Sequence, residues 1–369
     1  MTKSATAGRA PTIMLALTAH GFGHATQATP VINRLRASYP DLRLLVLTDI
    51  PRAWLDAWID GDYELLPMAT DPGMRMQDPL HVDIEATIQA YSDFSRAESR
   101  LVDELESLIR ARDVSLVLAD VPWLPLVAAR RQQRHAVALC SLNWADILEP
   151  LAPPHSGIEH ILAGIRDAYR NADLFIRPAP CMPMHWLGNS QAIGHISRTG
   201  KAGSRRVRRA LNLPDDHRLA LLQFGGETGD TKVRLPQVDG VTWLLAGRGN
   251  VGGRGHPADR LLKTLGMRFV DLVASVDVML TKPGYSSFAE AATHGLPLLS
   301  VHRDDWPEAP WLVDWVAQHL PLREISRRQL AAGDFDDLLT ELLDAPRTPG
   351  LPPSGIDEAT TALIPYLER

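Results

Sequence analysis

Short apolar runs that end in turns, with helical patterns between them, recur along the chain and limit its fold more than any other feature. Thr12 to Thr18 is such a run, and the turn His20 to His24 follows it. Apolar residues then recur at helical spacing from Ala25 to Ser38, before a second apolar run from Leu42 to Thr48. A strand, a helix and a second strand in this order form a βαβ unit, whose strands are parallel. The sequence therefore predicts a parallel sheet at the amino terminus.

The same alternation starts again in the second half, after a segment rich in proline and glycine at residues 178–203. Its apolar runs are Leu219 to Phe224, Val241 to Ala246 and Val276 to Thr281. A chain of 369 residues is long enough for two separate cores. We therefore expect an α/β fold with a first domain at 1–190, a second domain at 191–350 and a terminal helix at 351–369.

Composition excludes several classes of protein. The formal net charge is −6, with no long run of either sign, which argues against nucleic acid as a partner. The two cysteines, Cys140 and Cys181, cannot form a disulfide framework, so we expect a reducing, cytoplasmic location. The amino terminus is polar, and no apolar stretch approaches the roughly 18 residues of a membrane span. Membrane contact is therefore expected to be peripheral at most.

The strongest local motif is a strand-to-helix turn with the features of an anion site, Thr281 to Pro297 (TKPGYSSFAEAATHGLP). Ser286 stands at the position of a helix N-cap, and Gly284 would let a phosphate approach the free backbone N–H groups closely. Lys282 would add positive charge, and Glu290, about one turn into the helix, could accept hydrogen bonds from a ribose diol. The segment predicts a nucleoside diphosphate site; the alternative is a well-capped helix whose lysine and glutamate are solvated.

A second motif, HGFGHAT, occupies the first strand-to-helix turn at residues 20–26. Gly21 and Gly23 fit two positions of a dinucleotide fingerprint, but Thr26 replaces the third glycine, so the match is weak. The fingerprint also leaves the two histidines of the motif, His20 and His24, unexplained.

The second of these histidines, His24, is a candidate general base, because the dipole of the following helix disfavours its charged form. Such a base needs a carboxylate to orient it. Asp120 follows the apolar run Val114 to Ala119 and would reach the same edge of the sheet, and Asp49, after the second strand, is the competing candidate. The motif on its own also fits a structural histidine.

Two further features have plainer interpretations. The 13 histidines include no H-x-x-x-H pair next to a carboxylate or cysteine, so no metal site is expected. Trp54 and Trp58 are spaced for one face of a helix, which favours packing in the core. The alternative for this pair is an apolar lip for an acceptor or an edge that touches a membrane.

Several segments occur in an order that covers nearly the whole chain: HGFGHAT, DVPWLP, LNWADI, FGGE, and KPGYSSFAEAATHGLPLL followed by HRDDWPEAPWL. In this arrangement the sequence resembles the GT-B glycosyltransferases. It is similar in particular to the glycosyltransferase-like amino-terminal domain of L-arabinokinase, and more distantly to the N-acetylglucosaminyltransferase of peptidoglycan synthesis and the UDP-glucuronosyltransferase superfamily. The resemblance implies two Rossmann-like, doubly wound domains that face a cleft. The first would bind the acceptor, the second a nucleotide-sugar, and the terminal helix would return to the first.

The resemblance also assigns residues to each part of the cleft. His24 matches the family's catalytic histidine, and Asp120 matches the carboxylate that pairs with it. First-domain loops near the acceptor would contribute His20, Gly21, Gly23 and Asn143. The donor would be held by Gly225, Gly226, Lys282, Gly284 and Ser286 at its phosphates, by Glu290 at its ribose, by Phe269 and Val270 at its base, and by Asp304, Asp305 and Glu308 at its sugar.

The sequence departs from the family pattern twice. Gln27 stands where the arabinokinase-like motif usually has arginine, which bears on the acceptor. Asp304 and Asp305 replace a donor motif that contains glutamine, which bears on the donor sugar.

We therefore expect a glycosyltransferase that moves a sugar from a nucleoside diphosphate donor, a UDP-sugar, to an acceptor hydroxyl with inversion and without a metal. The nucleotide-sugar is a co-substrate, and no other cofactor is expected. The acceptor is expected to be a small molecule, a lipid-linked molecule or a natural product. Two alternatives are a nucleotide-sugar epimerase, which would act on the donor alone, and a non-catalytic regulatory module that binds a nucleotide-sugar.

Overall fold

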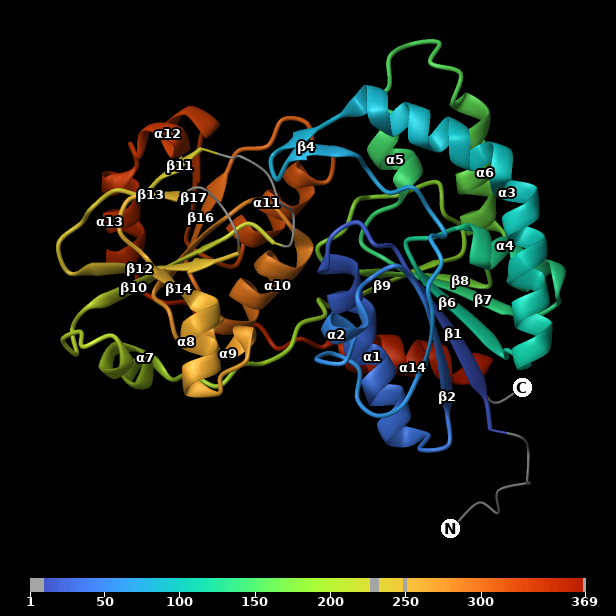
Figure 1. Cartoon of the computed structure of the whole chain (residues 1–369), viewed down its shortest axis with the longest axis horizontal. Coiled ribbons are helices and arrows are strands. Elements are labelled where there is room, and N and C mark those ends of the chain that lie inside the picture. Colours follow the sequence, from blue (N-terminus) through green and yellow to red (C-terminus); the bar gives the residue numbers. More distant parts are fainter. Residues whose placement is uncertain (1–9, 226–231, 248–250, 368–369) are drawn as a thin grey trace.

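The computed structural model describes residues 10–225, 232–247 and 251–367, and these residues form two parallel α/β sheets side by side (Figure 1). The first sheet has the order β3-β2-β1-β6-β7-β8-β9, and the second has the order β14-β12-β10-β15-β16-β17. In each sheet the order reverses about its first strand, β1 or β10, which is the pattern of a doubly wound fold. The expected α/β architecture is confirmed.

The strands of the first sheet are β1 (Thr12–Leu17), β2 (Arg43–Leu47), β3 (Glu64–Leu66), β6 (Leu116–Asp120), β7 (His135–Leu139), β8 (Leu174–Pro178) and β9 (Ser190–Ile193). Those of the second sheet are β10 (Arg218–Gln223), β12 (Val241–Ala246), β14 (His256–Pro257), β15 (Val278–Thr281), β16 (Leu298–Val301) and β17 (Leu322–Ile325). Two small pairs complete the strands described: β4 (Met76–Asp78) with β5 (His81–Val82), and β11 (Val233–Arg234) with β13 (Val251–Gly252). The first sheet thus ends at Ile193, just beyond the boundary expected at residue 190.

The helices around the first sheet are α1 (Gly23–Ser38), α2 (Arg52–Leu55), α3 (Ile84–Arg112), α4 (Leu124–Arg131), α5 (Trp144–Leu148) and α6 (Glu159–Arg170). Those of the second half are α7 (Ser204–Ala210), α8 (Ala258–Leu265), α9 (Phe269–Val273), α10 (Tyr285–His294), α11 (Ala309–Ala317), α12 (Arg327–Ala332) and α13 (Asp336–Asp344). The chain ends with α14 (Gly355–Leu363) and a 3₁₀ turn (Ile364–Tyr366).

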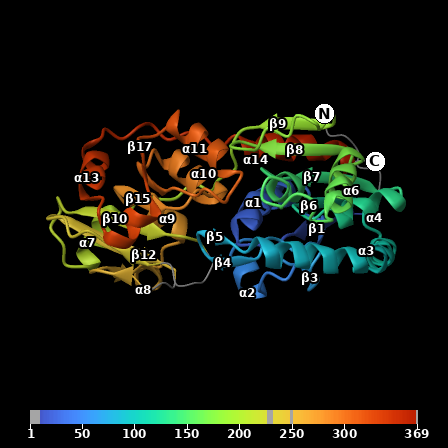
Figure 2. The same ribbon diagram turned by 90° about the horizontal axis from the view of Figure 1, so that it is seen from above.

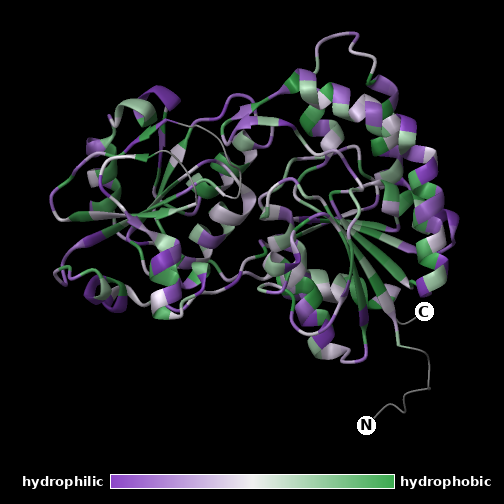
Figure 3. Cartoon of the chain, in the orientation of Figure 1, coloured by the Kyte–Doolittle hydropathy of each residue, from purple (hydrophilic) through white to green (hydrophobic). Residues whose placement is uncertain are grey.

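The central strands are apolar on both faces because helices cover both faces. All six residues of β1 are buried, with Ile13, Leu15 and Leu17 in a cluster with α1 and α14. Met14 and Ala16 point to the opposite cluster, which contains α3 and α4. Figure 3 shows the same contrast, with hydrophobic strands in both sheets and hydrophilic residues on the outward faces of the helices.

Two segments join the halves of the molecule. Helix α14 packs against α1 in the first half, although it follows the second half in the sequence (Figure 1). The hairpin of β4 and β5 leaves the first half and reaches the second (Figure 2). Its turn residue Leu80 is 1% exposed and lies in the second half's hydrophobic cluster, with Val278 and Phe335. In the described residues, no helix combines the length and apolar character that a membrane crossing requires.

Candidate active site

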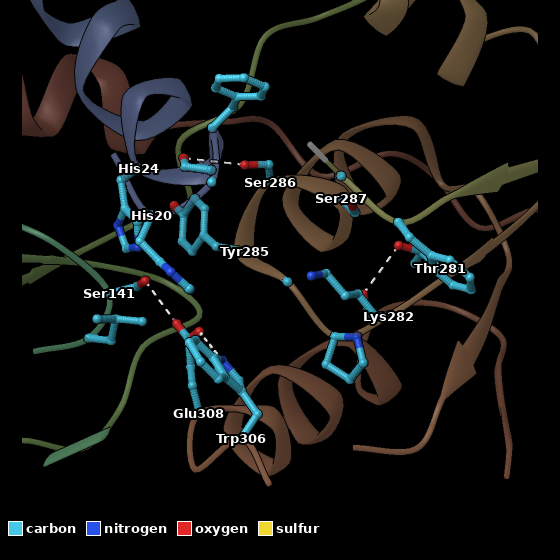
Figure 4. A pocket seen from close by; sticks show the side chains of 18 of the residues that line it. His20, His24, Ser141, Thr281, Lys282, Tyr285, Ser286, Ser287, Trp306 and Glu308 are labelled. Carbon is cyan, nitrogen blue, oxygen red and sulfur yellow. Dashed lines mark hydrogen bonds between the residues drawn. The ribbon is translucent and has the colours of Figure 1, made fainter. Parts of the chain in front are cut away.

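A cavity lies between the carboxyl ends of the two sheets, where ligands of doubly wound folds bind (Figure 4). The turn between β1 and α1 forms one wall, and the turn between β15 and α10 forms the opposite wall. The sequence-predicted residues that line it are His20, Gly21, Gly23, His24, Gly225, Lys282, Gly284, Ser286 and Glu308. Gly225 has a positive φ of 80°, and Gly226 lies outside the described residues.

His24 and Asp120 form a buried pair on the first wall. The Nδ1 atom of His24 lies 2.9 Å from Oδ1 of Asp120, and the latter residue is 0% exposed. A carboxylate only accepts, so Nδ1 donates and Nε2 is left for the cavity. The competing candidate, Asp49, is exposed and lines a neighbouring cavity instead.

Burial and the nearby charges shift the pKa values of this pair in opposite directions. Burial alone would lower the pKa of His24, but the carboxylates of Asp120, Glu308 and Asp71 raise it above the ordinary 6.5. Burial also raises the pKa of Asp120 to about 6, although the positive charge of His24 acts in the opposite direction. The imidazole is therefore a stronger base than a histidine in water, held by a carboxylate that has little solvent around it.

Glu308 belongs to the second half of the molecule and lies in the same cavity as His24. It is 3% exposed, and burial raises its pKa above the usual value. Its Oε1 accepts a hydrogen bond of 2.9 Å from the Ser141 hydroxyl, and its Oε2 accepts one of 3.2 Å from the Trp306 indole (Figure 4). Glu308 thus lines the cavity together with the base and acts on it electrostatically.

His20 is held neutral between two indole rings. Its ring stacks on Trp306 at 5.6 Å and meets the edge of Trp144 at 5.3 Å. Burial, together with the nearby positive charges of His24, Lys282 and Arg303, lowers the pKa of His20 to about 3. His20 therefore offers hydrogen bonds without charge at neutral pH.

The opposite wall contains the amino terminus of α10. The N-cap is Gly284, not Ser286 as expected from the sequence, so no side chain caps the first backbone N–H groups. Ser286 lies one position inside the helix instead, and its hydroxyl contacts Thr26 Oγ1 at 2.5 Å and the Gly23 carbonyl at 3.3 Å. Because no acidic residue lies in the first turn, the helix end keeps its positive potential.

Lys282 lies at the same end of α10, and it contacts the hairpin from the first half. Its Nζ donates a hydrogen bond of 3.0 Å to the carbonyl oxygen of Pro79. One turn into the helix, Glu290 is 7% exposed and is not part of the cavity lining. Burial raises the pKa of Glu290 to about 7, although the positive charge of Arg198 lowers it.

The two aspartates expected at the donor sugar do not line this cavity. Asp304 is exposed and pairs with His302 at 2.7 Å. Asp305 accepts a hydrogen bond of 2.8 Å from the backbone N–H of Val82 and pairs with Arg327 at 2.9 Å. Asp305 therefore fastens the hairpin of β4 and β5 to the second half.

Three other residues predicted at the site pack within the fold and do not line the cavity. Asn143 is buried and caps α5, accepting a hydrogen bond of 2.9 Å from the backbone of Asp146. Phe269 and Val270 begin α9 and do not line the cavity. The Val270 carbonyl packs so closely on Gly200 that a β-carbon there would overlap it.

Sequence reasoning missed Ser141, Trp306 and Arg303, all of which line the cavity. Arg303 and Trp306 lie in the HRDDWPEAPWL segment, where the guanidinium of Arg303 is 4.4 Å from the centre of the Trp306 ring. The signal for Ser141 was its place just after β7, at the carboxyl edge of the sheet.

The tryptophan pair, predicted to pack in the core, is only half-buried. Trp54 stacks between Phe22 and Trp58, at 4.9 Å and 5.1 Å, and Arg198 covers the outer ring. In the part of the chain that the structure describes, no group of three or more metal-ligating side chains is placed to hold an ion.

Two Rossmann-like domains with a cavity between the carboxyl edges of their sheets define the class: the chain has the GT-B fold. No family model matches the sequence. It is similar to L-arabinokinase from Arabidopsis thaliana, with 26% identity over 329 residues, which are 88% of this chain and 31% of that protein. The chain thus spans about a third of the length of this curated relative.

Solved structures of low sequence identity have the same fold. CalG4, the calicheamicin glycosyltransferase, has a TM-score of 0.62 and 16% identity, covering 98% of this chain and 99% of that one. The glycosyltransferase VinC, in complex with dTDP, has a TM-score of 0.58 and 14% identity, covering 97% and 100%. A putative UDP-N-acetylglucosamine 2-epimerase from Listeria monocytogenes has a TM-score of 0.55 and 15% identity, covering 97% of each chain.

Proposed function

We propose that the protein is an inverting, metal-independent glycosyltransferase that moves a sugar from a UDP-sugar to an acceptor hydroxyl. The observation that carries this proposal is the buried pair of His24 and Asp120, which faces the uncapped end of α10 and Lys282 across one cavity. A base on one wall and an anion site on the other are the two parts that such a transfer needs.

On the first wall, His24 takes the proton of the acceptor hydroxyl at Nε2. Asp120 fixes the tautomer through the 2.9 Å hydrogen bond to Nδ1 and stabilises the imidazolium that forms. The raised pKa of His24 makes it a more effective proton acceptor once it is neutral. The acceptor oxygen attacks the anomeric carbon as its proton leaves.

On the second wall, the diphosphate leaves with the electron pair of the glycosidic C–O bond. The backbone N–H groups at the start of α10 and the ammonium of Lys282 stabilise the negative charge that develops on it. These groups supply the positive potential that a metal would otherwise supply. Because nucleophile and leaving group belong to opposite walls, attack occurs from the face opposite the diphosphate, with inversion.

Calorimetric titration with UDP, dTDP and GDP, followed by donor turnover in His24→Ala, tests this function. We expect UDP to bind wild type and His24→Ala alike, and turnover to fall at least about 100-fold in the variant. His302→Ala is the matched control, because His302 is exposed and lies outside the cavity. Wild-type turnover in His24→Ala would show the role of His24 to be wrong, and absence of binding to all three nucleotides would remove the enzyme proposal.

A nucleotide-sugar epimerase is the second candidate. It is favoured by the likeness to the putative Listeria epimerase and by the additional acids around His24, namely Glu308 and Asp71. An epimerase would convert the donor sugar with no acceptor present. Proton exchange from solvent deuterium into the donor sugar, measured by NMR without an acceptor, separates the two activities.

A further inference from the structure

A short segment of the second half, residues 306–309, is docked on the first half beside the candidate base (Figure 4). It lies between β16 and α11, and its residues Trp306 and Ala309 are buried in the hydrophobic cluster of the first half, together with Trp144. The ring of Trp306 also stacks on His20 at 5.6 Å. This docked segment is therefore packed as part of the first half, although it belongs to the second half in the sequence.

The carboxylate of the docked segment, Glu308, is joined to helix α1 by a chain of hydrogen bonds. Its Oε1 accepts a hydrogen bond of 2.9 Å from the Ser141 hydroxyl, and the Ser141 oxygen accepts one of 3.2 Å from Nε2 of Gln27. A carboxylate only accepts, so the single proton of the serine hydroxyl is given to Glu308. Gln27 is fully buried and lies three residues after His24 on α1, so the two side chains are neighbours on one face of that helix.

The docked segment also contributes to the charges around His24. Burial disfavours the imidazolium, and three carboxylates oppose this effect and raise the pKa of His24. Asp120 at the end of β6 and Asp71 in the loop before β4 belong to the first half. Glu308 is the carboxylate of these three that comes from the second half, so its effect on His24 depends on docking.

Two cations of the second half, Lys282 and Arg303, also act on this turn. Burial lowers the pKa of His20, and the charges of His24, Lys282 and Arg303 act in the same direction. Burial raises the pKa of Glu308, whereas the charges of His24 and Arg303 favour its ionised form. Protonation of His24 and ionisation of Glu308 therefore favour each other.

We propose that Glu308 is a positioning residue that completes the catalytic base from across the cavity. With the segment docked, the hydrogen bonds through Ser141 hold α1 at Gln27. The carboxylate of Glu308 stabilises the imidazolium that forms when Nε2 of His24 takes the proton of the acceptor hydroxyl, and the proton stays on His24. The inference rests on the proposed function for the role of His24, and it makes the strength of the base depend on contact between the two halves.

NMR titration of the His24 ring in the full chain tests the proposal without turnover, with the resonance assigned by its absence from His24→Ala. We expect Glu308→Gln to lower the pKa of His24 by at least about 0.5 unit, because the imidazolium loses a nearby carboxylate. Asp314→Asn is the matched control, since Asp314 is an exposed acid on α11, the helix that begins beside Glu308, and it should leave the pKa of His24 unchanged.

Turnover adds a readout that a merely structural role would not move, using UDP-glucose, UDP-galactose or UDP-N-acetylglucosamine, whichever wild type consumes. The base must be neutral to act, so a lower pKa of His24 moves the acid limb of the pH–rate profile to lower pH. We expect kcat of Glu308→Gln to fall at least about tenfold, with KM within about threefold. A residue that holds the transferred sugar, as the family resemblance implies for Glu308, would instead raise KM.

Ser141→Ala keeps the proposal testable if Glu308→Gln fails to fold. It removes the hydroxyl that joins Glu308 to Gln27, and it should lower the pKa of His24 by at least about 0.2 unit. An unshifted pKa of His24 in a folded Glu308→Gln variant, an equal shift in Asp314→Asn, or a raised KM at unchanged kcat overturns the proposal. If Ser141→Ala is the variant that folds, an unshifted pKa there does the same. Absence of UDP binding or of turnover is instead a failure of the proposed function, and the titration of His24 is independent of it.

Discussion

Glu290 provides the sharpest test of how burial and donor binding are related in this protein. Its side chain lies on α10 and is 7% exposed, and burial raises the pKa of its carboxyl from 4.5 to about 7. A group whose pKa is higher in the folded state than in the unfolded state holds its proton more tightly when folded. Its contribution to stability is therefore fully present below about pH 4.5 and is lost as the pH rises through about 7.

The change Glu290→Gln removes this titration while keeping the shape of the side chain. The difference between the two pKa values corresponds to about 3 kcal/mol, at about 1.4 kcal/mol for each unit. Relative to wild type, the variant should therefore gain about 3 kcal/mol of unfolding free energy between pH 4.5 and pH 8.5. At about 2–4 °C for each kcal/mol in a domain of 150–250 residues, that is about 6–12 °C in Tm.

The same change should weaken donor binding if Glu290 accepts hydrogen bonds from the ribose hydroxyls. UDP would then bind the ionised carboxylate, and wild type should release a proton on binding near pH 7. Calorimetry in two buffers of different ionisation enthalpy measures that proton directly. We expect Glu290→Gln to bind UDP about 10–100-fold more weakly and to release no such proton.

Glu104→Gln serves as the control, because Glu104 is an exposed glutamate on α3. Two outcomes would refute the reasoning separately. If the Tm values of Glu290→Gln and wild type run parallel from pH 5 to pH 8.5, the carboxyl is not destabilised by burial. If UDP affinity and proton release are unchanged, Glu290 does not hold the ribose.

Three further changes test other parts of the structure. Asp120→Asn removes the carboxylate that raises the pKa of His24, so the pKa of the imidazole should fall and kcat should drop about 10²- to 10⁴-fold at unchanged UDP affinity. An imidazole NMR titration and a pH–rate profile check this, and an unshifted His24 resonance contradicts it. Leu80→Ala should weaken docking of the hairpin by about 2–4 kcal/mol and speed its cleavage by trypsin, whereas equal cleavage rates contradict the packing argument. Gly295→Ala should lower the unfolding free energy in urea by at least about 2 kcal/mol, because Gly295 has a φ of 60° and a β-carbon would overlap the Thr348 carbonyl; an unchanged midpoint contradicts this.

The fold could be predicted because its signals are local. β1 is buried at all six positions, which is why its sequence is a continuous apolar run rather than an alternating one. The place of His24 at the end of such a strand follows from the same pattern. Its partner was ambiguous because β2 and β6 both flank β1, and so both Asp49 and Asp120 follow neighbouring strands. The two aspartates differ in where their side chains point, and this direction depends on the residue at which each strand ends.

Contacts between distant segments could not be predicted from the sequence. Asp305 forms a hydrogen bond with the backbone of Val82, which lies 223 residues earlier in the chain, beyond the reach of any periodicity. The prediction that Ser286 is the N-cap was wrong for a local reason. Tyr285 already has helical geometry, so the cap falls at Gly284 and the serine hydroxyl turns to the first half of the molecule.

Several groups expected to hold the donor are engaged in contacts between the two halves, and this has an energetic consequence. Lys282 donates to Pro79, and Ser286 contacts Thr26, in a cavity of about 150 Å³. Cavities that enclose drug-sized ligands are larger, at about 300–1,000 Å³. A nucleotide-sugar must therefore exchange with these contacts and separate the walls. The exchange is favourable at Lys282, since a charged phosphate oxygen accepts a hydrogen bond about twice as strong as that of a neutral carbonyl. Under the proposed function, donor binding is therefore coupled to movement of the hairpin at Pro79.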